Sequence, residues 1–117
     1  MKKKVFVCFL KSPVGTGYYI EGIRASLGVL SGDEEHEVYV AFMGKGVRSA
    51  LKGVDRAYSA RMLGSLTEMV VGGALHVERE SLAEEGFMES DLDQGFSVAP
   101  REEIWKMMSA ADVTLSF

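Results

Sequence analysis

The fold is decided by a short stretch near the start of the chain, which reads Val5-Phe6-Val7-Cys8-Phe9-Leu10. The run is apolar throughout and rich in β-branched and aromatic side chains. Continuous rather than alternating apolarity is typical of a strand covered on both faces, as in a parallel sheet between helices. Two similar runs, at residues 38–43 and 69–75, predict a second and a third buried strand.

Helical patterns separate these strands. Ile20, Ile23, Leu27 and Leu30 recur at helical spacing, and the pattern ends near Gly32. Further helices are predicted at residues 47–51, 57–63 and 78–85, and a last helix at residues 100–111, with Pro100 in its first position.

Two more strands complete the pattern, a brief one near Phe96 and a final one at residues 113–117 with one buried face. Gly86 and Phe87 are placed to close the helix predicted at residues 78–85 in a Schellman motif. Alternating strands and helices imply right-handed crossovers. The sequence therefore predicts the α/β class: a three-layer α/β/α, flavodoxin-like architecture with a mostly parallel sheet of about five strands.

Length and charge narrow the functional classes. A chain of 117 residues, 47% hydrophobic and 26% charged, fits one domain over residues 1–117. A net charge of −4, with Lys2–Lys4 as the basic cluster, disfavours direct nucleic-acid binding. The first apolar run is too short for a signal peptide, and no segment has the length of a membrane span. One cysteine agrees with a reducing compartment, so we expect a cytoplasmic protein.

Candidate binding residues lie in three loops that follow predicted strands, because ligands of open parallel sheets bind beyond the carboxyl ends of the strands. The loops cover residues 11–17, 44–46 and 76–78. They supply Ser12, Gly15, Thr16, Lys45, His76 and Glu78 as crevice candidates. The dinucleotide fingerprint fails at its third glycine, so a small anion at a helix start and a plain tight turn both remain open.

Cys8 lies inside the first apolar strand, where burial should raise its pKa and make it inert. An accessible, catalytic Cys8 is the alternative. Neither His36 nor His76 has a second His or Cys at ligand spacing. We therefore expect no metal and no cofactor.

Several motifs in order along the chain resemble the DsrE/DsrF-like family, which includes the Tus proteins of the tRNA 2-thiouridine sulfur relay. They are Ser12-Pro13-x-Gly15-Thr16 after a lysine-led strand, a strand and Gly-x-Gly-Val at residues 38–47, Ser81-Leu82-x-x-x-Gly86, and a terminal strand at residues 111–117 similar to the DsrF/TusC branch. Lys45 replaces the family's usual Asp in the second motif.

The resemblance implies a cysteine at the start of the helix after the third strand in the members that carry sulfur. A helix N-terminus there would stabilise a thiolate or persulfide. In this chain the position falls on or beside Glu78, and residues 76–80 contain no cysteine. A carboxylate cannot accept sulfane sulfur.

The resemblance thus implies a non-catalytic subunit or paralogue of an intracellular sulfur-relay complex. The family implies a homo-oligomer, trimeric or hexameric, or a hetero-oligomer with other DsrE-like subunits. The aromatic residues available for an interface are Tyr18, Tyr19, Phe87, Phe96 and Trp105. Two alternatives stay open: a small-molecule or anion-binding domain, and a sulfurtransferase acting through Cys8.

Overall fold

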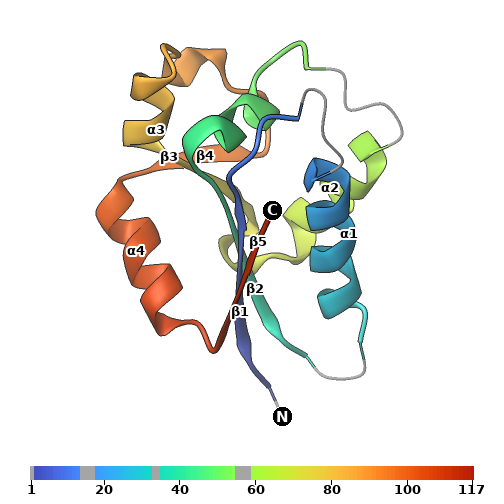
Figure 1. Cartoon of the computed structure of the whole chain (residues 1–117). Coiled ribbons are helices and arrows are strands. Elements are labelled where there is room, and N and C mark those ends of the chain that lie inside the picture. Colours follow the sequence, from blue (N-terminus) through green and yellow to red (C-terminus); the bar gives the residue numbers. More distant parts are fainter. Residues whose placement is uncertain (1, 14–17, 33–34, 55–58) are drawn as a thin grey trace.

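The first strand, β1 (Lys4–Phe9), lies between two parallel neighbours, β2 (Glu37–Phe42) and β5 (Val113–Ser116). The computed structural model describes residues 2–13, 18–32, 35–54 and 59–117. β3 (Leu75–Glu78) and β4 (Phe96–Ala99) extend the sheet beyond β2, in the order β4-β3-β2-β1-β5, and every pairing is parallel. The predicted five-stranded parallel sheet is confirmed (Figure 1).

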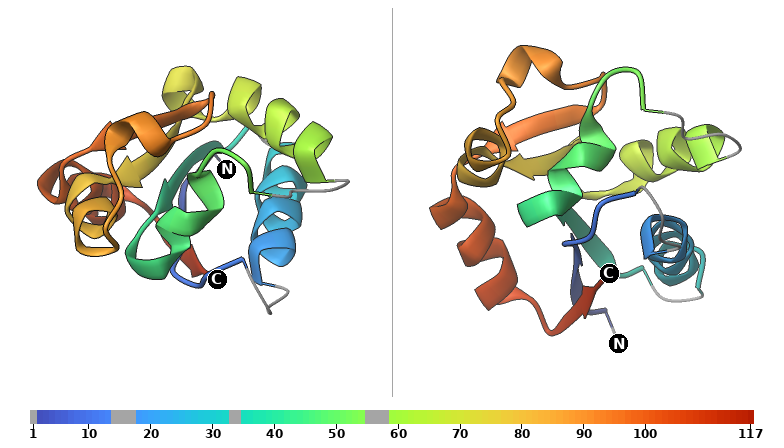
Figure 2. Two further views of the ribbon diagram at one scale, coloured as in Figure 1. Left: turned by 90° about the horizontal axis from the view of Figure 1, so that it is seen from above. Right: turned by 45° about the horizontal axis from the view of Figure 1, so that its top comes forward.

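Helices cover both faces of this sheet. α1 (Tyr18–Leu30) and α2 (Ser59–Met69) lie on one face, and α4 (Arg101–Ala110) lies on the other (Figures 1 and 2). α3 (Arg79–Glu84) follows β3 at the end of the sheet, and its Leu82 packs into the same core as α1 and α2. Short 3₁₀ turns, η1 (Gly44–Ala50), η2 (Val71–Gly73) and η3 (Glu89–Asp91), connect the larger elements. The predicted three-layer arrangement is therefore confirmed.

β1 is apolar throughout because its two sets of side chains enter two cores. Val5, Val7 and Phe9 belong to the larger core, under α1 and α2, where the ring of Phe9 stacks on that of Phe42 at 4.6 Å between centroids. Phe6 and Cys8 enter a smaller core on the α4 face. Burial of one large apolar side chain stabilises the fold by about 1.5–3 kcal/mol, so β1 contributes to both layers.

The predicted third strand at residues 69–75 is wrong in its position. Met69 is the last residue of α2, and residues 71–73 form η2. Gly72 and Gly73 adopt left-handed backbone angles, with φ of 83° and 66°, which a strand does not accommodate. The strand begins after them, at Leu75. The apolar run closes a helix and turns the chain before β3 starts.

The structure also decides expectations about individual helices and their ends. The helix predicted at residues 47–51 is the earlier and longer 3₁₀ turn η1, while part of the piece predicted at residues 57–63 lies outside the described residues. Pro100 is the N-cap of α4 rather than its first residue. The Schellman closure of α3 is confirmed, because the Phe87 N–H donates to the Leu82 carbonyl at 3.0 Å and Gly86 has φ of 85°.

β5 does not have the buried face that its alternating sequence predicts. Val113 is 38% exposed, and Leu115 and Phe117 are half-buried. β5 is the edge strand of the sheet, and α1 lies against β1 and β2 rather than across β5. Alternating apolarity identifies the strand but does not show what covers it.

Two glycines of α1 should respond in opposite ways to alanine. A Cβ at Gly28 would meet nothing within 4 Å, so Gly28→Ala should raise the free energy of unfolding by about 0.5–1 kcal/mol through helix propensity. A Cβ at Gly22 would lie 2.6 Å from the buried ring of Phe9. Gly22→Ala should therefore lower the free energy of unfolding, although alanine has the same advantage in helix propensity there. Urea denaturation of both variants checks the prediction; equal responses would contradict it.

Candidate functional site

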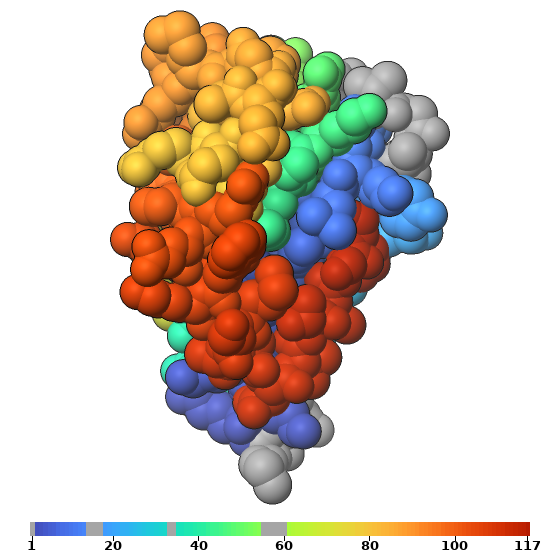
Figure 3. All heavy atoms as spheres, turned by 60° about the vertical axis from the view of Figure 1, so that its left-hand side comes forward, coloured from blue at the N-terminus to red at the C-terminus, as the bar shows by residue number. Residues whose placement is uncertain are grey.

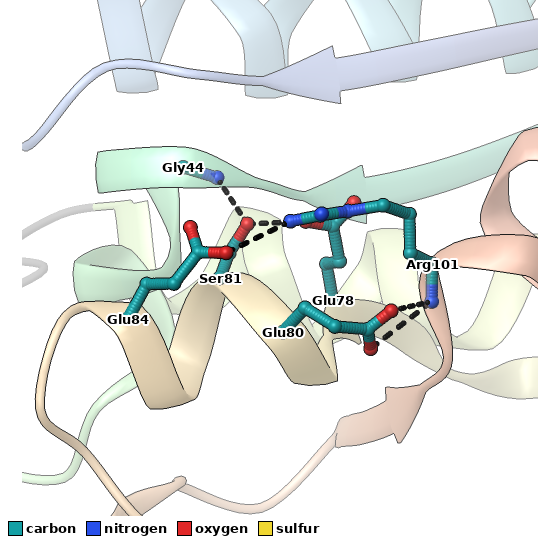
Figure 4. Close-up of polar contacts among 6 residues, drawn as sticks. All are labelled: Gly44, Glu78, Glu80, Ser81, Glu84 and Arg101. Atoms are coloured by element: carbon teal, nitrogen blue, oxygen red, sulfur yellow. Dashed lines mark hydrogen bonds and ion pairs between the residues drawn. The ribbon is translucent and has the colours of Figure 1, made fainter.

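Three neighbouring strands end in polar groups that meet at one place. β2 is followed by Gly44, β3 ends at Glu78, and β4 leads through Pro100 to Arg101 at the start of α4. β4, β3 and β2 are adjacent in the sheet, so these groups lie close together at the carboxyl-terminal end of the strands (Figure 4). Ser81, on the first turn of α3, completes the cluster.

Glu78 is the centre of this cluster. Its side chain is 2% exposed, and its Oε1 accepts hydrogen bonds from Arg101 Nη2 at 2.8 Å and Arg101 Nε at 3.1 Å. The Ser81 hydroxyl donates a short hydrogen bond to the same oxygen. Three donors therefore converge on one carboxylate atom, which offsets the cost of burying its charge. The other oxygen, Oε2, is buried and has no hydrogen-bond partner among the described residues.

Arg101 and Ser81 tie three elements to Glu78. The Gly44 N–H donates to Ser81 Oγ at 2.8 Å and joins the end of β2 to α3. The backbone N–H of Arg101 donates to the Glu80 carboxylate at 2.9 Å, which satisfies a free donor at the start of α4. Its guanidinium also reaches Glu84 Oε1 at 3.3 Å. The hydrogen bonds that its guanidinium donates to the Glu78 carboxylate raise the pKa of Arg101.

The sequence-derived crevice candidates do not all meet here. Glu78 is in the cluster, and Lys45 is exposed on η1 immediately after Gly44. Ser12 is half-buried in the loop after β1, and Gly15 and Thr16 lie outside the described residues. His76 lies within β3 rather than at its end, paired in register with Ala41 and Ser97. Glu78 therefore lies close to η1, whereas His76 lies two residues before it in β3.

Sequence reasoning missed the partners of Glu78. Arg101 falls within the predicted helix at residues 100–111 without a role of its own, and Ser81 appears there as part of a family motif. A usable signal exists, because Arg101 directly follows Pro100 at the carboxyl end of a strand. A cation at the end of one parallel strand and a buried carboxylate at the end of its neighbour are placed to pair.

Cys8 is buried, with 3% of its surface exposed, and packs with Phe6, Ala41 and Ile104. Burial raises the pKa of its thiol, and a hydrogen bond with Ser116 opposes that shift. The expectation of a buried thiol with a raised pKa is confirmed. Among the described residues no three His, Cys, Asp or Glu side chains cluster as metal ligands. In the same part of the chain, no helix combines the length and apolarity needed to cross a bilayer.

His76 provides a prediction on pH. Burial lowers its pKa below the usual value, with Glu103 acting in the opposite direction. The unfolded chain then binds the proton more tightly, so folding stability should fall as pH drops from about 6.5 through the lowered pKa. Urea denaturation at a series of pH values should show this acid-side slope reduced in His76→Gln. An unchanged slope would contradict the assignment.

The all-parallel sheet between helices defines the chain as an α/β protein, and its polar groups gather at the carboxyl ends of the strands, where ligands of such sheets commonly bind. The sequence profile of the DsrE/DsrF-like family matches residues 3–117. The chain therefore belongs to the DsrE/DsrF-like family.

Two solved structures have the same fold over their whole length. The ychN protein from E. coli superposes with a TM-score of 0.76 at 17% sequence identity, covering 100% of both chains. The protein of unknown function MTH1491 from Methanobacterium thermoautotrophicum superposes with a TM-score of 0.74 at 14% identity, again over 100% of both chains. No sequence of a curated protein is significantly similar to this one. At these identities the likeness shows the fold alone.

Proposed function

We propose that this chain is a DsrE/DsrF-like subunit or paralogue, of the DsrF/TusC kind, that works in a cytoplasmic sulfur-relay complex without carrying sulfur itself. One observation carries the proposal. Where the family resemblance implies a cysteine in sulfur carriers, this chain has Glu78, buried and bonded to Arg101 and Ser81. A carboxylate accepts no sulfane sulfur, and here it uses the cation and hydroxyl that would stabilise a sulfur anion.

Cys8 is a poor substitute for a carrier cysteine. Its thiol is 3% exposed, and burial raises its pKa, whereas a sulfur acceptor needs an accessible thiolate. Phe6, Ala41 and Ile104 fill the space around it. Sulfur transfer through Cys8 would therefore require this core to open.

Assembly with other subunits is part of the proposal. Tyr18 and Trp105 are 46% and 55% exposed, so both are available for an interface, whereas Tyr19 is only 7% exposed and belongs to the core. Figure 3 shows the face formed by α4 and β5, with η1 and the end of β1 visible between them. A homo-oligomer, trimeric or hexameric, or a hetero-oligomer with other DsrE-like subunits would cover such side chains. A pathway such as tRNA thiolation would supply the partners.

A second candidate is an anion or small-molecule site beside η1. Lys45 is exposed, has no carboxylate partner among the described residues, and adjoins the Gly44 N–H of the cluster. Titration of sulfate or phosphate, followed by NMR, should shift the backbone signals of η1 in the natural chain and less in Lys45→Gln. No saturable shift in the natural chain would exclude this candidate.

Sulfur loading tests the main proposal. The chain is incubated with a cysteine desulfurase and labelled cysteine, and its intact mass is measured under non-reducing conditions. We expect no sulfur adduct, while a known carrier treated in parallel acquires one. A reproducible adduct that disappears in Cys8→Ser would overturn the proposal in favour of a sulfurtransferase. Light scattering after size exclusion reports the assembly, and a strict monomer would count against the subunit role.

A further inference from the structure

β5 is held to the fold by few buried contacts. It is an edge strand, and in the part of the chain that the structure describes it pairs with β1 alone, through four residues in register. Three of its four side chains are exposed, and Leu115 is half-buried. The free energy of a local opening follows the buried contacts that it breaks, so β5 should detach at a much lower cost than the whole fold unfolds.

The residue before β5 is anchored more firmly than β5 itself. The Asp112 N–H donates to the Lys4 carbonyl at 2.8 Å, and the Asp112 carboxylate accepts from the Lys4 N–H at 2.8 Å. On the other side of this residue, α4 is held to the sheet by the fully buried Ile104 and by the ion pair of Arg101 with Glu78. Asp112 is therefore placed as a hinge, from which β5 can swing out while α4 stays docked.

Phe117, directly after β5, makes the contacts at the other end of the strand. Its N–H donates to the Cys8 carbonyl at 2.9 Å, and its carbonyl accepts from the Leu10 N–H at 2.6 Å. Its half-buried ring lies 6.2 Å from the ring of Phe9, measured between centroids. An opening of β5 has to break these contacts together with the ladder to β1, and no others of comparable burial.

The residue that β5 covers is Cys8. In the sheet it lies between Ser116 of β5 and Ala41 of β2, each in register with it, and its thiol hydrogen-bonds with Ser116. Ile104 packs against it from α4, and only 3% of its surface is exposed. When β5 detaches, one side of Cys8 is uncovered, whereas Ala41 and Ile104 stay in place.

We propose that β5 is a detachable strap, hinged at Asp112, and that its local opening controls the access of thiol reagents to Cys8. The closed strap keeps the thiol buried, and the open strap exposes it while the other four strands and the helices keep their packing. The device stands apart from the proposed role in a sulfur relay, since no sulfur transfer enters it.

Thiol exchange in the full chain tests the opening. The probe is 5,5′-dithiobis(2-nitrobenzoate), at concentrations to which the rate stays proportional. The Cys8 thiolate attacks its disulfide, and one thionitrobenzoate anion leaves and is measured by its absorbance. The rate of the urea-unfolded chain is the reference. The folded chain should react far more slowly than this reference, yet at least about tenfold faster than the equilibrium constant of global unfolding allows. Urea below the unfolding transition should change the rate little, because the opening exposes little surface.

Two variants separate the strap from the rest of the fold. Phe117→Ala removes the ring contact with Phe9 and should make Cys8 react about tenfold faster in native buffer. Val70→Ala is the control, because Val70 is also an apolar contact but precedes β3, which is separated from β5 by β2 and β1. It should lower the urea concentration at which the chain unfolds and change the Cys8 rate by less than about twofold. Circular dichroism verifies the folding of both variants.

Hydrogen exchange gives a readout that does not involve the thiol. The Leu10 N–H, bonded to Phe117, should exchange with the same small dependence on urea as the Cys8 reaction. The Met43 N–H, bonded to Phe9 from the β2 side, should show a steeper dependence.

Three results would overturn the proposal. The first is a Cys8 rate no higher than global unfolding allows, and the second is a rate equal to that of the unfolded chain. The third is an equal acceleration in Phe117→Ala and Val70→Ala, which would mean that Cys8 becomes accessible only when the whole sheet opens.

Discussion

Gly46→Ala should destabilise the fold by about 3 kcal/mol or more, the largest loss expected from a single added methyl group at any glycine that the structure describes. A Cβ at Gly46 would overlap the carbonyl oxygen of Phe9 and lie 2.5 Å from its carbonyl carbon. The obstacle is backbone rather than a flexible side chain. The same Phe9 carbonyl accepts from the Met43 N–H at 3.0 Å, so β1 cannot move away without breaking the connection to η1. Urea or thermal denaturation measures the loss.

Lys45→Ala is the control for this prediction. Lys45 is the neighbouring residue of the same turn and is exposed, so its truncation should change the free energy of unfolding by no more than about 0.5 kcal/mol. If Gly46→Ala unfolds at the same denaturant concentration as Lys45→Ala, η1 does not lie against β1 as described.

The second large effect should come from Arg101→Met. This change leaves the Glu78 carboxylate, 2% exposed, without its counter-charge, and stranding a buried charge costs about 3–5 kcal/mol. Glu78→Met should cost less, because the guanidinium of Arg101 is already 32% exposed and can still reach Glu84. The double variant, with both charges removed, should recover most of the loss. Chemical denaturation of the three variants forms a complete double-mutant cycle.

Lys106→Met makes the matched comparison on the same helix. Its Nζ lies 3.7 Å from Glu102 Oε1, but the two side chains are 75% and 81% exposed. Surface pairs of this kind are worth about 0–1 kcal/mol. Should Arg101→Met cost no more than Lys106→Met, the Glu78–Arg101 pair is not holding α3 and α4 to the sheet.

The sequence predicts the fold well where a single physical cause determines it. The apolar run of β1 has to be covered on both faces, and the structure has helices there. Residues 69–75 have an equally apolar sequence, yet two glycines with positive φ break the run into the end of α2 and a turn. Periodicity cannot detect that difference, because the glycines act through backbone angles rather than through apolarity.

The sequence predicts where the candidate site lies, but it does not predict which residues surround Glu78. Ligand-binding residues of parallel sheets lie at the carboxyl ends of the strands, and this rule identifies Glu78 as a candidate. Glu78 is buried because residues of α3 and α4 pack around it. Its partner Arg101 is 23 positions away in sequence. Their contact depends on β3 and β4 being adjacent, which the sequence does not specify. His76 lies inside β3 rather than beyond it because the predicted strand, at residues 69–75, ends three residues before β3 does, at Glu78.

The position of β1 between β2 and β5 has a consequence for how the chain folds. The Lys4 N–H and the Asp112 carboxylate that accepts it are 108 positions apart, and the last strand pairs with the first. During synthesis β1 and β2 can associate early, but one side of β1 stays unpaired until β5 has left the ribosome. Sheets closed by such distant contacts fold in milliseconds to seconds, far more slowly than helical bundles. The nascent chain therefore has a prolonged stage in which β1 is a hydrophobic open edge, and that stage is the one at which chaperones would engage it.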